Sequence, residues 1–191
     1  RLKPQEKRNE PVMMFIIYYI DCIIINALII YLYKVKIRYR KNKKMARNLL
    51  DLAKSLEKRI AKIEENANEV SKELARRILF DLIYITPVDT SNALSNWQIG
   101  INNPVQTELQ PYFPGIAGLT QSQSAKAAFH VGNALLNGKK SGDGVYISNV
   151  VDYITDLNEG SSPQVTRNFV KTAVIRNTIE MFKTGRVKLL R

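Results

Sequence analysis

Apolar residues recur at alternating spacings of four and three along a long stretch of the chain. The stripe consists of Leu49, Ala53, Leu56, Ile60, Ile63, Ala67, Val70 and Leu74. No Gly or Pro interrupts it, so the pattern predicts one helix over residues 46–84. A heptad stripe is typical of a coiled-coil oligomerisation helix, and also of a helix packed lengthwise on its own sheet. The small side chains of Ala53 and Ala67 favour packing on the sheet.

Two short segments have the alternation of apolar and polar residues that is expected of strands. In residues 95–101, Trp97, Ile99 and Ile101 share one side, as in a half-buried strand. Residues 145–149, which read VYISN, predict a second strand.

Proline and glycine mark the ends of the predicted helices. Thr86-Pro87 ends the first helix, because the residue before a proline is pushed out of the helical region. Residues 122–137 predict a second helix with Gly138 as its C-cap, and residues 165–183 predict a closing helix. This order predicts an α+β fold, in which a long N-terminal helix packs on a small, mostly antiparallel sheet with two further helices.

Composition narrows the classes of protein. The 191 residues fit one domain with an appendage, and the 45% of apolar residues excludes wholesale disorder. One cysteine, Cys22, excludes an internal disulfide framework. One histidine, His130, excludes a His-rich metal centre.

The N-terminal 44 residues differ from the remainder in hydrophobicity and charge. In residues 12–33, 20 of 22 positions are apolar, which is enough for a helix to span about 30 Å of hydrocarbon. A basic run over 34–44 follows, so the positive-inside rule places the C-terminal side in the cytoplasm. Residues 1–44 carry eleven Lys/Arg against three Asp/Glu, whereas residues 45–191 carry eighteen against fourteen.

Two observations weaken a transmembrane interpretation of residues 12–33. Asp21 lies near the middle of the segment, where a carboxylate costs about 3 kcal/mol. Met45 also opens a stretch that has the form of a normal protein start. An upstream extension of a gene that starts at Met45, a true membrane segment, and a buried or strand-forming arm all stay open. We divide the chain into an extension, 1–44, and a domain, 45–191, and expect the extension to be dispensable for folding.

The predicted domain contains no recognisable catalytic constellation. His130 has no carboxylate or nucleophile at a useful spacing, so we expect a core or boundary histidine. Acidic residues in the polar loops are expected to act as caps and turn formers, namely Asp89, Asp152, Asp156 and Glu159. We therefore expect no enzyme activity, no catalytic residues, no cofactor and no metal.

Nucleic-acid and phosphate binding receive little support. The Gly138-Lys-Lys-Ser141 fragment lacks the leading glycine of a phosphate loop and precedes a strand, so a hairpin-like turn is predicted. Lys and Arg beyond residue 44 are scattered among acidic residues without an aromatic platform. Sequence-specific recognition of nucleic acid is therefore not expected.

Two segments together resemble a known family. Residues 84–97 read YITPVDTSNALSNW, and residues 145–164 read VYISNVVDYITDLNEGSSPQ. They resemble the tail-completion, or head–tail joining, proteins of tailed bacteriophages, in which a long helix precedes a "TPVDTG.L..SW" element and a "LE.G.S.QAP" loop precedes the closing helix. The resemblance covers residues 46–183. The chain departs from the family pattern at Ser91, Asn158-Glu159 and Val165-Thr166, which affects the loops more than the assignment.

The resemblance implies a virion structural protein of the neck, a minor tail protein assembled in the host cytoplasm. Its subunits would form a homo-oligomeric ring between the head-side connector and the tail, held by heterologous contacts that close. DNA would pass through the lumen without being read in sequence. The rival hypothesis is a membrane-anchored oligomeric accessory protein that uses residues 12–33 as its anchor.

The motifs also suggest residue roles. Gly160 permits a turn with positive φ, so that the loop can present hydrogen bonds to a neighbour. The residues expected to contact a subunit or partner are Glu159, Gly160, Ser162 and Gln164. Asp89 and Thr90 are expected to bond to nearby backbone amides. The expected organisers of the fold are Pro87, Asp89, Thr90, Trp97, Asn149 and Tyr153.

Overall fold

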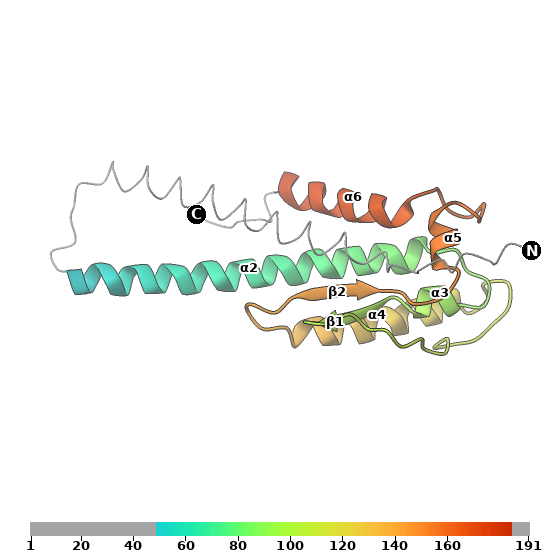
Figure 1. The fold of residues 1–191 in the computed structure, drawn as a ribbon, viewed down its shortest axis with the longest axis horizontal. Helices are drawn as coiled ribbons and strands as arrows, with labels where there is room; N and C mark the ends of the chain where they lie inside the picture. Colours follow the sequence, from blue (N-terminus) through green and yellow to red (C-terminus); the bar gives the residue numbers. More distant parts are fainter. Residues whose placement is uncertain (1–48, 185–191) are drawn as a thin grey trace, which may run out of the picture.

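The computed structural model describes residues 49–184 (Figure 1). The predicted extension 1–44, its apolar segment 12–33 and Met45 lie outside the described residues. The helices and strands follow one another in the order α2 (Leu49–Ile85), α3 (Asn92–Ser95), β1 (Gln98–Ile101), α4 (Gln121–Asn137), β2 (Val145–Ser148), α5 (Ile154–Asn158) and α6 (Phe169–Lys183). The predicted α+β class, with a long first helix, an antiparallel sheet and further helices, is confirmed.

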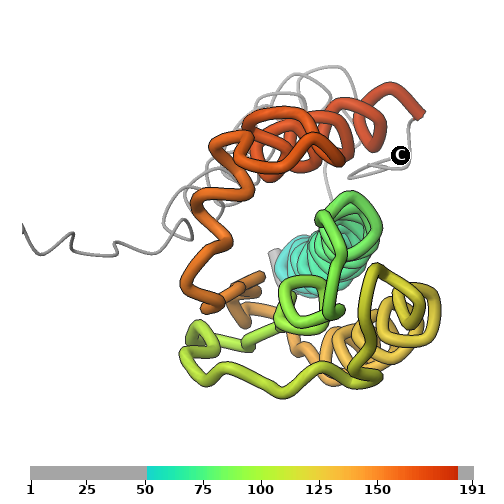
Figure 2. Tube along the Cα trace, turned by 90° about the vertical axis from the view of Figure 1, so that its right-hand side faces the viewer, coloured from blue at the N-terminus to red at the C-terminus, as the bar shows by residue number. Residues whose placement is uncertain are grey.

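Helix α2 is the central element of the fold. Figures 1 and 2 show α6 along one side of it, with the sheet and α4 along the other. The C-terminal half of α2 carries much of the core, through Leu74, Ala75, Ile78, Leu79, Leu82 and Ile83. The predicted packing on the sheet holds for this half, whereas Leu56 and Ile60 of the same helix are 46% and 54% exposed. Helix α2 ends at Ile85, directly before Thr86-Pro87 as predicted.

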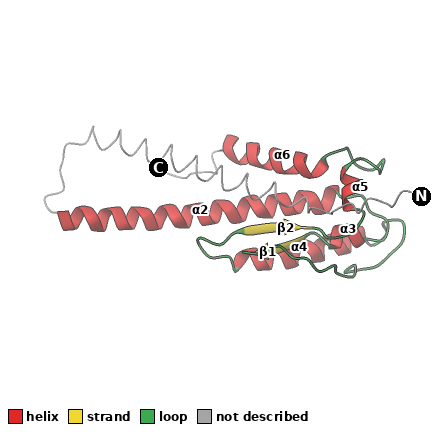
Figure 3. Ribbon diagram, in the orientation of Figure 1, coloured by secondary structure: helices red, strands yellow, loops and turns green. Residues whose placement is uncertain are grey.

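Within the described residues the sheet consists of one antiparallel pair of strands (Figure 3). Ile99 lies opposite Ile147 and Ile101 lies opposite Val145, so the two strands bring apolar residues together. The first strand is shorter than the predicted 95–101, because its start is helical. Ser95 ends α3, where its N–H donates to the carbonyl of Ser91 at 3.2 Å.

Helix α4 approaches α2 and β1 closely at a glycine. Gly132 is buried, and a Cβ added there would lie 2.4 Å from Leu79 Cδ2 and 3.3 Å from Ile99 Cγ1. Gly132 therefore permits the helix, the strand and α2 to share one core. Arg76 adds a polar link at the edge, since its Nε donates to Asn133 Oδ1 at 2.6 Å.

Helix α6 begins at Phe169, later than the predicted residue 165. Asn168 directly before it has φ 60, a left-handed conformation that separates the preceding loop from the helix. The helix is held to α2 by buried apolar residues and by ion pairs. Arg176 Nη2 lies 2.6 Å from Asp81 Oδ2, and Arg77 Nη1 lies 3.5 Å from Glu180 Oε1.

Two connections differ from expectation. Residues 138–144 contain a tight turn, in which the N–H of Asp143 donates to the carbonyl of Lys140 at 3.3 Å, but this turn joins a helix, α4, to β2 and is not a hairpin. Gly138 caps α4 as expected, but with a right-handed φ of −76. Residues 154–158 form the short helix α5, which the sequence pattern did not predict.

Candidate functional site

The two segments that carry the family resemblance meet at one end of the molecule, the end that Figure 2 shows facing the viewer. The N–H of Val88 donates to Gln164 Oε1 at 3.1 Å, although the two residues are 76 positions apart. Loops from three parts of the chain lie at this end. We call residues 86–91, 113–120 and 159–168 the loop cluster.

The first loop leaves α2 through a buried hydrogen-bond pair. Trp97 Nε1 donates to Thr86 Oγ1 at 2.7 Å, and the hydroxyl of Thr86 donates to the carbonyl of Leu82 at 2.6 Å. Both Thr86 and Trp97 are buried, and Pro87 follows half-buried. The chain direction after α2 is therefore set by the indole of a residue eleven positions further on.

Asp89 connects the first loop to the second. Its Oδ1 accepts a hydrogen bond from the N–H of Ala117 at 3.0 Å, and its carbonyl accepts one from Gly118 at 2.9 Å. The expected partners were nearby amides, but the actual amide lies 28 positions away, because residues 113–120 return to this end of the domain. Thr90 beside Asp89 is exposed.

The second loop is also tied to the domain at its two ends. Ser91 Oγ and Thr120 Oγ1 lie 3.1 Å apart at one end. At the other, the N–H of Phe113 donates to Ser124 Oγ at 3.1 Å, and the same hydroxyl donates to the Phe113 carbonyl at 3.0 Å. These contacts hold the loop in one conformation.

Asn96 holds the segment that leads into this loop, and it was missing from the predicted organisers. Its Oδ1 accepts from the N–H of Leu109 at 2.7 Å, and its Nδ2 donates to the carbonyls of Leu109 at 2.9 Å and Asn92 at 3.0 Å. The side chain is fully buried. Asn96 therefore bonds to both the backbone N–H and the carbonyl of Leu109, as a neighbouring strand would at the edge of a sheet.

The held loop presents large apolar side chains to solvent. Ile116 is 73% exposed and Leu119 is 81% exposed, and Phe113 is also exposed. Exposed apolar residues gathered on one ordered loop are typical of a contact surface. These exposed residues were not among the predicted contact residues. The available signal was the presence of large apolar residues in a segment rich in proline and glycine.

Asn149 and Tyr153 lie between β2 and α5. Asn149 Nδ2 donates to the carbonyl of Ala93 at 2.7 Å, and its Oδ1 accepts from the N–H of Val151 at 3.2 Å. The end of β2 is thereby joined to α3. Tyr153 is exposed and occupies the N-cap position of α5.

Gly160 has φ 95, the left-handed conformation expected for it. The N–H of Gly160 donates to the carbonyl of Leu157 at 3.1 Å, and the N–H of Ser161 donates to that of Asp156 at 3.0 Å. This pair of bonds is a Schellman motif, which ends α5 and requires the left-handed residue. Glu159 and Gly160 are exposed.

Ser162 and Gln164 make contacts inside the loop cluster. Ser162 Oγ accepts from the N–H of Gln164 at 3.2 Å, and the Gln164 side chain accepts from Val88. Both residues therefore shape the third loop. Of the four predicted contact residues, Glu159, Gly160 and Gln164 are exposed, and Ser162 is half-buried.

The described part of the chain contains no group of three or more His, Cys, Asp or Glu residues that could hold a metal ion. His130 is exposed on α4, so the expectation of a core or boundary position is wrong. The reason is helical phase: α4 buries its opposite face, which includes Ala128 and Gly132.

Lys139 of the Gly-Lys-Lys-Ser fragment is buried against α2. Its Nζ donates to Asn68 Oδ1 at 2.7 Å and to the Lys140 carbonyl at 3.1 Å. Burial lowers the pKa of this ammonium group. The side chain points into the domain, whereas the side chain of a phosphate-binding lysine would point toward solvent.

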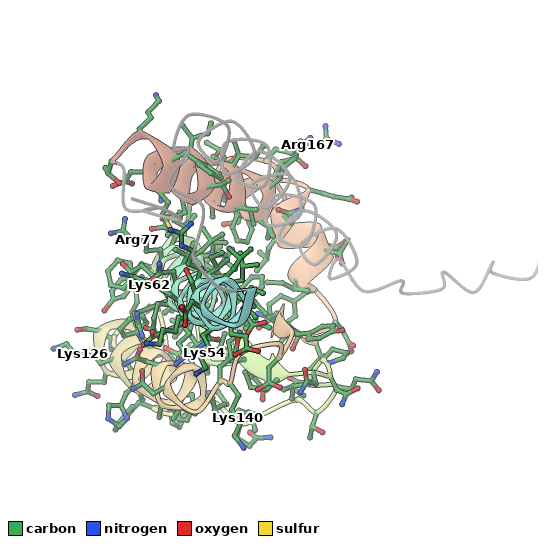
Figure 4. The ribbon with its side chains drawn as sticks, turned by 90° about the vertical axis from the view of Figure 1, so that its left-hand side faces the viewer. Lys54, Lys62, Arg77, Lys126, Lys140 and Arg167 are labelled. Atoms are coloured by element: carbon green, nitrogen blue, oxygen red, sulfur yellow. The ribbon has the colours of Figure 1, made fainter. Side chains whose placement is uncertain are left out.

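Basic side chains lie on several sides of the molecule. In the view of Figure 4, Arg167 before α6, Lys126 on α4 and Lys140 before β2 point in different directions from the central helix. Arg77 is paired with Glu73 at 2.8 Å. These labelled residues do not gather into one basic face.

Comparison of the chain with models of known families, with curated proteins and with solved structures finds no match. Within residues 49–184, none of the helices combines the length and the apolar character needed to cross a membrane.

Proposed function

We propose that the chain is a structural subunit of the head–tail junction of a tailed bacteriophage. In this role it is a neck or tail-completion protein, and its copies form a ring between the head-side connector and the tail. The observation that carries the proposal is the hydrogen bond between Val88 and Gln164, which joins the two segments that resemble the family. Two motifs far apart in sequence are then parts of one surface.

The loop cluster has the properties that such a contact surface needs. Its first two loops are fixed by Asp89, and its second loop exposes Ile116 and Leu119. A loop that is already ordered loses little conformational entropy when a partner binds. Apolar side chains on one end of a subunit suit a heterologous contact, in which one patch meets a different patch on the neighbour.

The proposal assigns contact roles to residues on two loops. Glu159 and Gly160 contribute from the third loop, and Ile116 and Leu119 contribute from the second. Ser162 and Gln164 hold the third loop in place. The partners are further copies of the chain, the head-side connector and the tail, and DNA passes through the ring without sequence-specific contacts.

Electron microscopy of phage particles tests the proposal. The double substitution Ile116→Asp and Leu119→Asp places charges at the exposed apolar tips. We expect filled heads that lack joined tails. Val131→Asp is the matched control, since Val131 is an exposed apolar residue of α4 outside the loop cluster, and its particles should be complete. Circular dichroism of the purified variants checks that they fold.

Normal joining by the folded double variant would contradict the proposal. Antibody labelling of purified virions provides an independent readout, with signal expected at the neck. Absence from virions together with recovery in membranes would favour the membrane-anchored alternative that residues 12–33 suggest. Portal, capsid and tail-tube genes beside the coding sequence would support the virion role.

A further inference from the structure

The N-terminal half of α2 extends beyond the body of the domain. Figure 1 shows it projecting past the sheet, α4 and α6. Within residues 51–62 only Leu52 is partly covered, and Leu74 is the first buried residue of the range 51–85. A 3.4 Å hydrogen bond from Ser141 Oγ to the carbonyl of Glu64 joins the helix to the loop before β2. About fifteen residues of helix, or about 22 Å, therefore project from the domain.

This projecting half carries a narrow apolar seam, which we define as Ala53, Leu56, Ile60 and Ile63. Their spacings of three, four and three are those of heptad a and d positions. The side chains of Leu56 and Ile60 are about half exposed, although both are large and apolar. The four residues occupy successive a and d positions, with Leu52 beside them at a g position, and such a seam fits a second helix of the same pattern.

We propose that this seam pairs with the same seam of a second copy of the chain, with the two helices parallel and in register. The seam lies at the opposite end of α2 from the loop cluster. The inference therefore does not depend on the role in a virion.

Charged residues beside the seam select the parallel arrangement. Glu57 and Glu64 occupy e positions on one flank, and Arg59 occupies a g position on the other. In a parallel in-register pair, g of one helix lies near the following e of the other, so Arg59 meets Glu64 of the second copy, twice per pair. An antiparallel pair would instead place the two glutamate flanks together, which is repulsive.

Residues 12–33 of the same chain are the competing occupant, and they fit the seam less well. That segment is apolar at 20 of 22 positions, hence on every side of a helix. A seam of four residues would leave most of such a helix uncovered. The matching width and the charge pairing therefore favour a second copy.

Disulfide cross-linking of the full chain in mild detergent tests the arrangement. In a Cys22→Ser background, Ala53→Cys and Ile60→Cys are each oxidised and run on a non-reducing gel. Both should form covalent dimers, because both are a positions that face themselves only in a parallel pair in register. Lys58→Cys, which points away from the seam at an f position, is the control and should stay monomeric.

Failure of Ala53→Cys to form dimers overturns the parallel register. A further reaction examines the competing occupant: Ile60→Cys with Cys22 retained should still give dimers. An intramolecular cross-link to Cys22 in place of dimers would show that the chain's own segment covers the seam, and would overturn the proposal.

Charge exchange provides a second measurement. By sedimentation equilibrium, Arg59→Glu should weaken self-association several-fold at low salt, and Arg59→Glu combined with Glu64→Arg should restore it. The double substitution Leu56→Lys and Ile60→Lys should abolish association through the seam, while Ile175→Lys and Ile179→Lys, on exposed apolar residues of α6, should leave it unchanged. Equal association of the wild-type chain and the seam variant would also overturn the proposal.

Discussion

The indole nitrogen of Trp97 donates a 2.7 Å hydrogen bond to the side-chain hydroxyl of Thr86. The same hydroxyl donates to the carbonyl of Leu82, one turn back in α2. A single buried threonine therefore lies at the end of the long helix and accepts a hydrogen bond from Trp97, the residue directly before β1. This pair determines where the loop cluster begins.

Thr86→Val should destabilise the domain, because it leaves the buried Trp97 N–H without an acceptor. The expected loss in the free energy of unfolding is about 1–3 kcal/mol, the usual cost of a buried unsatisfied donor. Urea denaturation followed by tryptophan fluorescence measures it, since Trp97 is the single tryptophan. Thr86→Ser keeps the hydroxyl and should lose less. Equal losses for the two variants would mean that the methyl group, and not the hydrogen bond, matters.

Asn96→Asp should release the segment that leads into the second loop. The amide of Asn96 donates to the carbonyls of Leu109 and Asn92, and a carboxylate in its place faces those carbonyls with no proton to offer. We expect a loss of about 1–3 kcal/mol at neutral pH. Asn103→Asp, on an exposed neighbour, is the control.

Lowering the pH should reduce the deficit of Asn96→Asp, because burial raises the pKa of an unpaired carboxyl group and a protonated one can donate. Urea denaturation at neutral and at acidic pH measures this difference. A deficit that is unchanged by acid would show that the carbonyls do not cause it.

Much of the fold could be predicted because its signals are local. The heptad stripe and Thr86-Pro87 predicted α2 and its end, and the alternation around Ile99 predicted the first strand. The C-terminal half of the stripe, which packs on the domain, and the N-terminal half, which projects from it, have the same sequence period. Leu74 is buried and Ile60 is exposed only because the sheet, α4 and α6 lie beside the C-terminal half.

The site depended on contacts that no local pattern contains. Asp89 was expected to bond to a near neighbour, but Ala117 reaches it from 28 positions away. Ile116 and Leu119 lie in a segment whose prolines and glycines indicate only a loop. Their exposure follows from how Asn96 and Asp89 hold that segment, which is a property of the folded chain.

Gly160→Val should strain the end of α5, because a β-branched residue at φ 95 costs about 1–3 kcal/mol. The nearest atom to an added Cβ is Arg167 Cβ at 3.5 Å, so the cost arises from the backbone and not from a clash. Gly142→Val is the matched control, with φ 88 and open space, in the loop between α4 and β2. Thermal melts of both should show similar losses.

Tail joining should then separate the two glycine variants. If Gly160 shapes a contact loop, particles carrying Gly160→Val should accumulate unjoined heads, whereas those carrying Gly142→Val should not. Normal joining by Gly160→Val, combined with loss of function in a folded His130→Ala variant, would require a catalytic interpretation in place of a structural one.

Glu73 should make the stability of the domain depend on acid pH. Burial opposes ionisation of its carboxyl group, but the hydrogen bonds and the positive charges of Arg77 and Arg76 together outweigh burial and lower its pKa below the ordinary 4.5. A carboxyl group whose pKa is lowered by folding stabilises the fold at pH values above its pKa in the unfolded chain. This stability is lost as the pH falls through the pKa of the folded state.

Glu73→Gln should therefore reduce the free energy of unfolding by about 0.5–1 kcal/mol at neutral pH, the range for a partly exposed pair. The deficit should vanish below the folded pKa. Urea denaturation across this pH range measures both effects, with Glu65→Gln on the exposed part of α2 as the control. A deficit that persists unchanged in acid would show that Glu73 acts through packing and not through its charge.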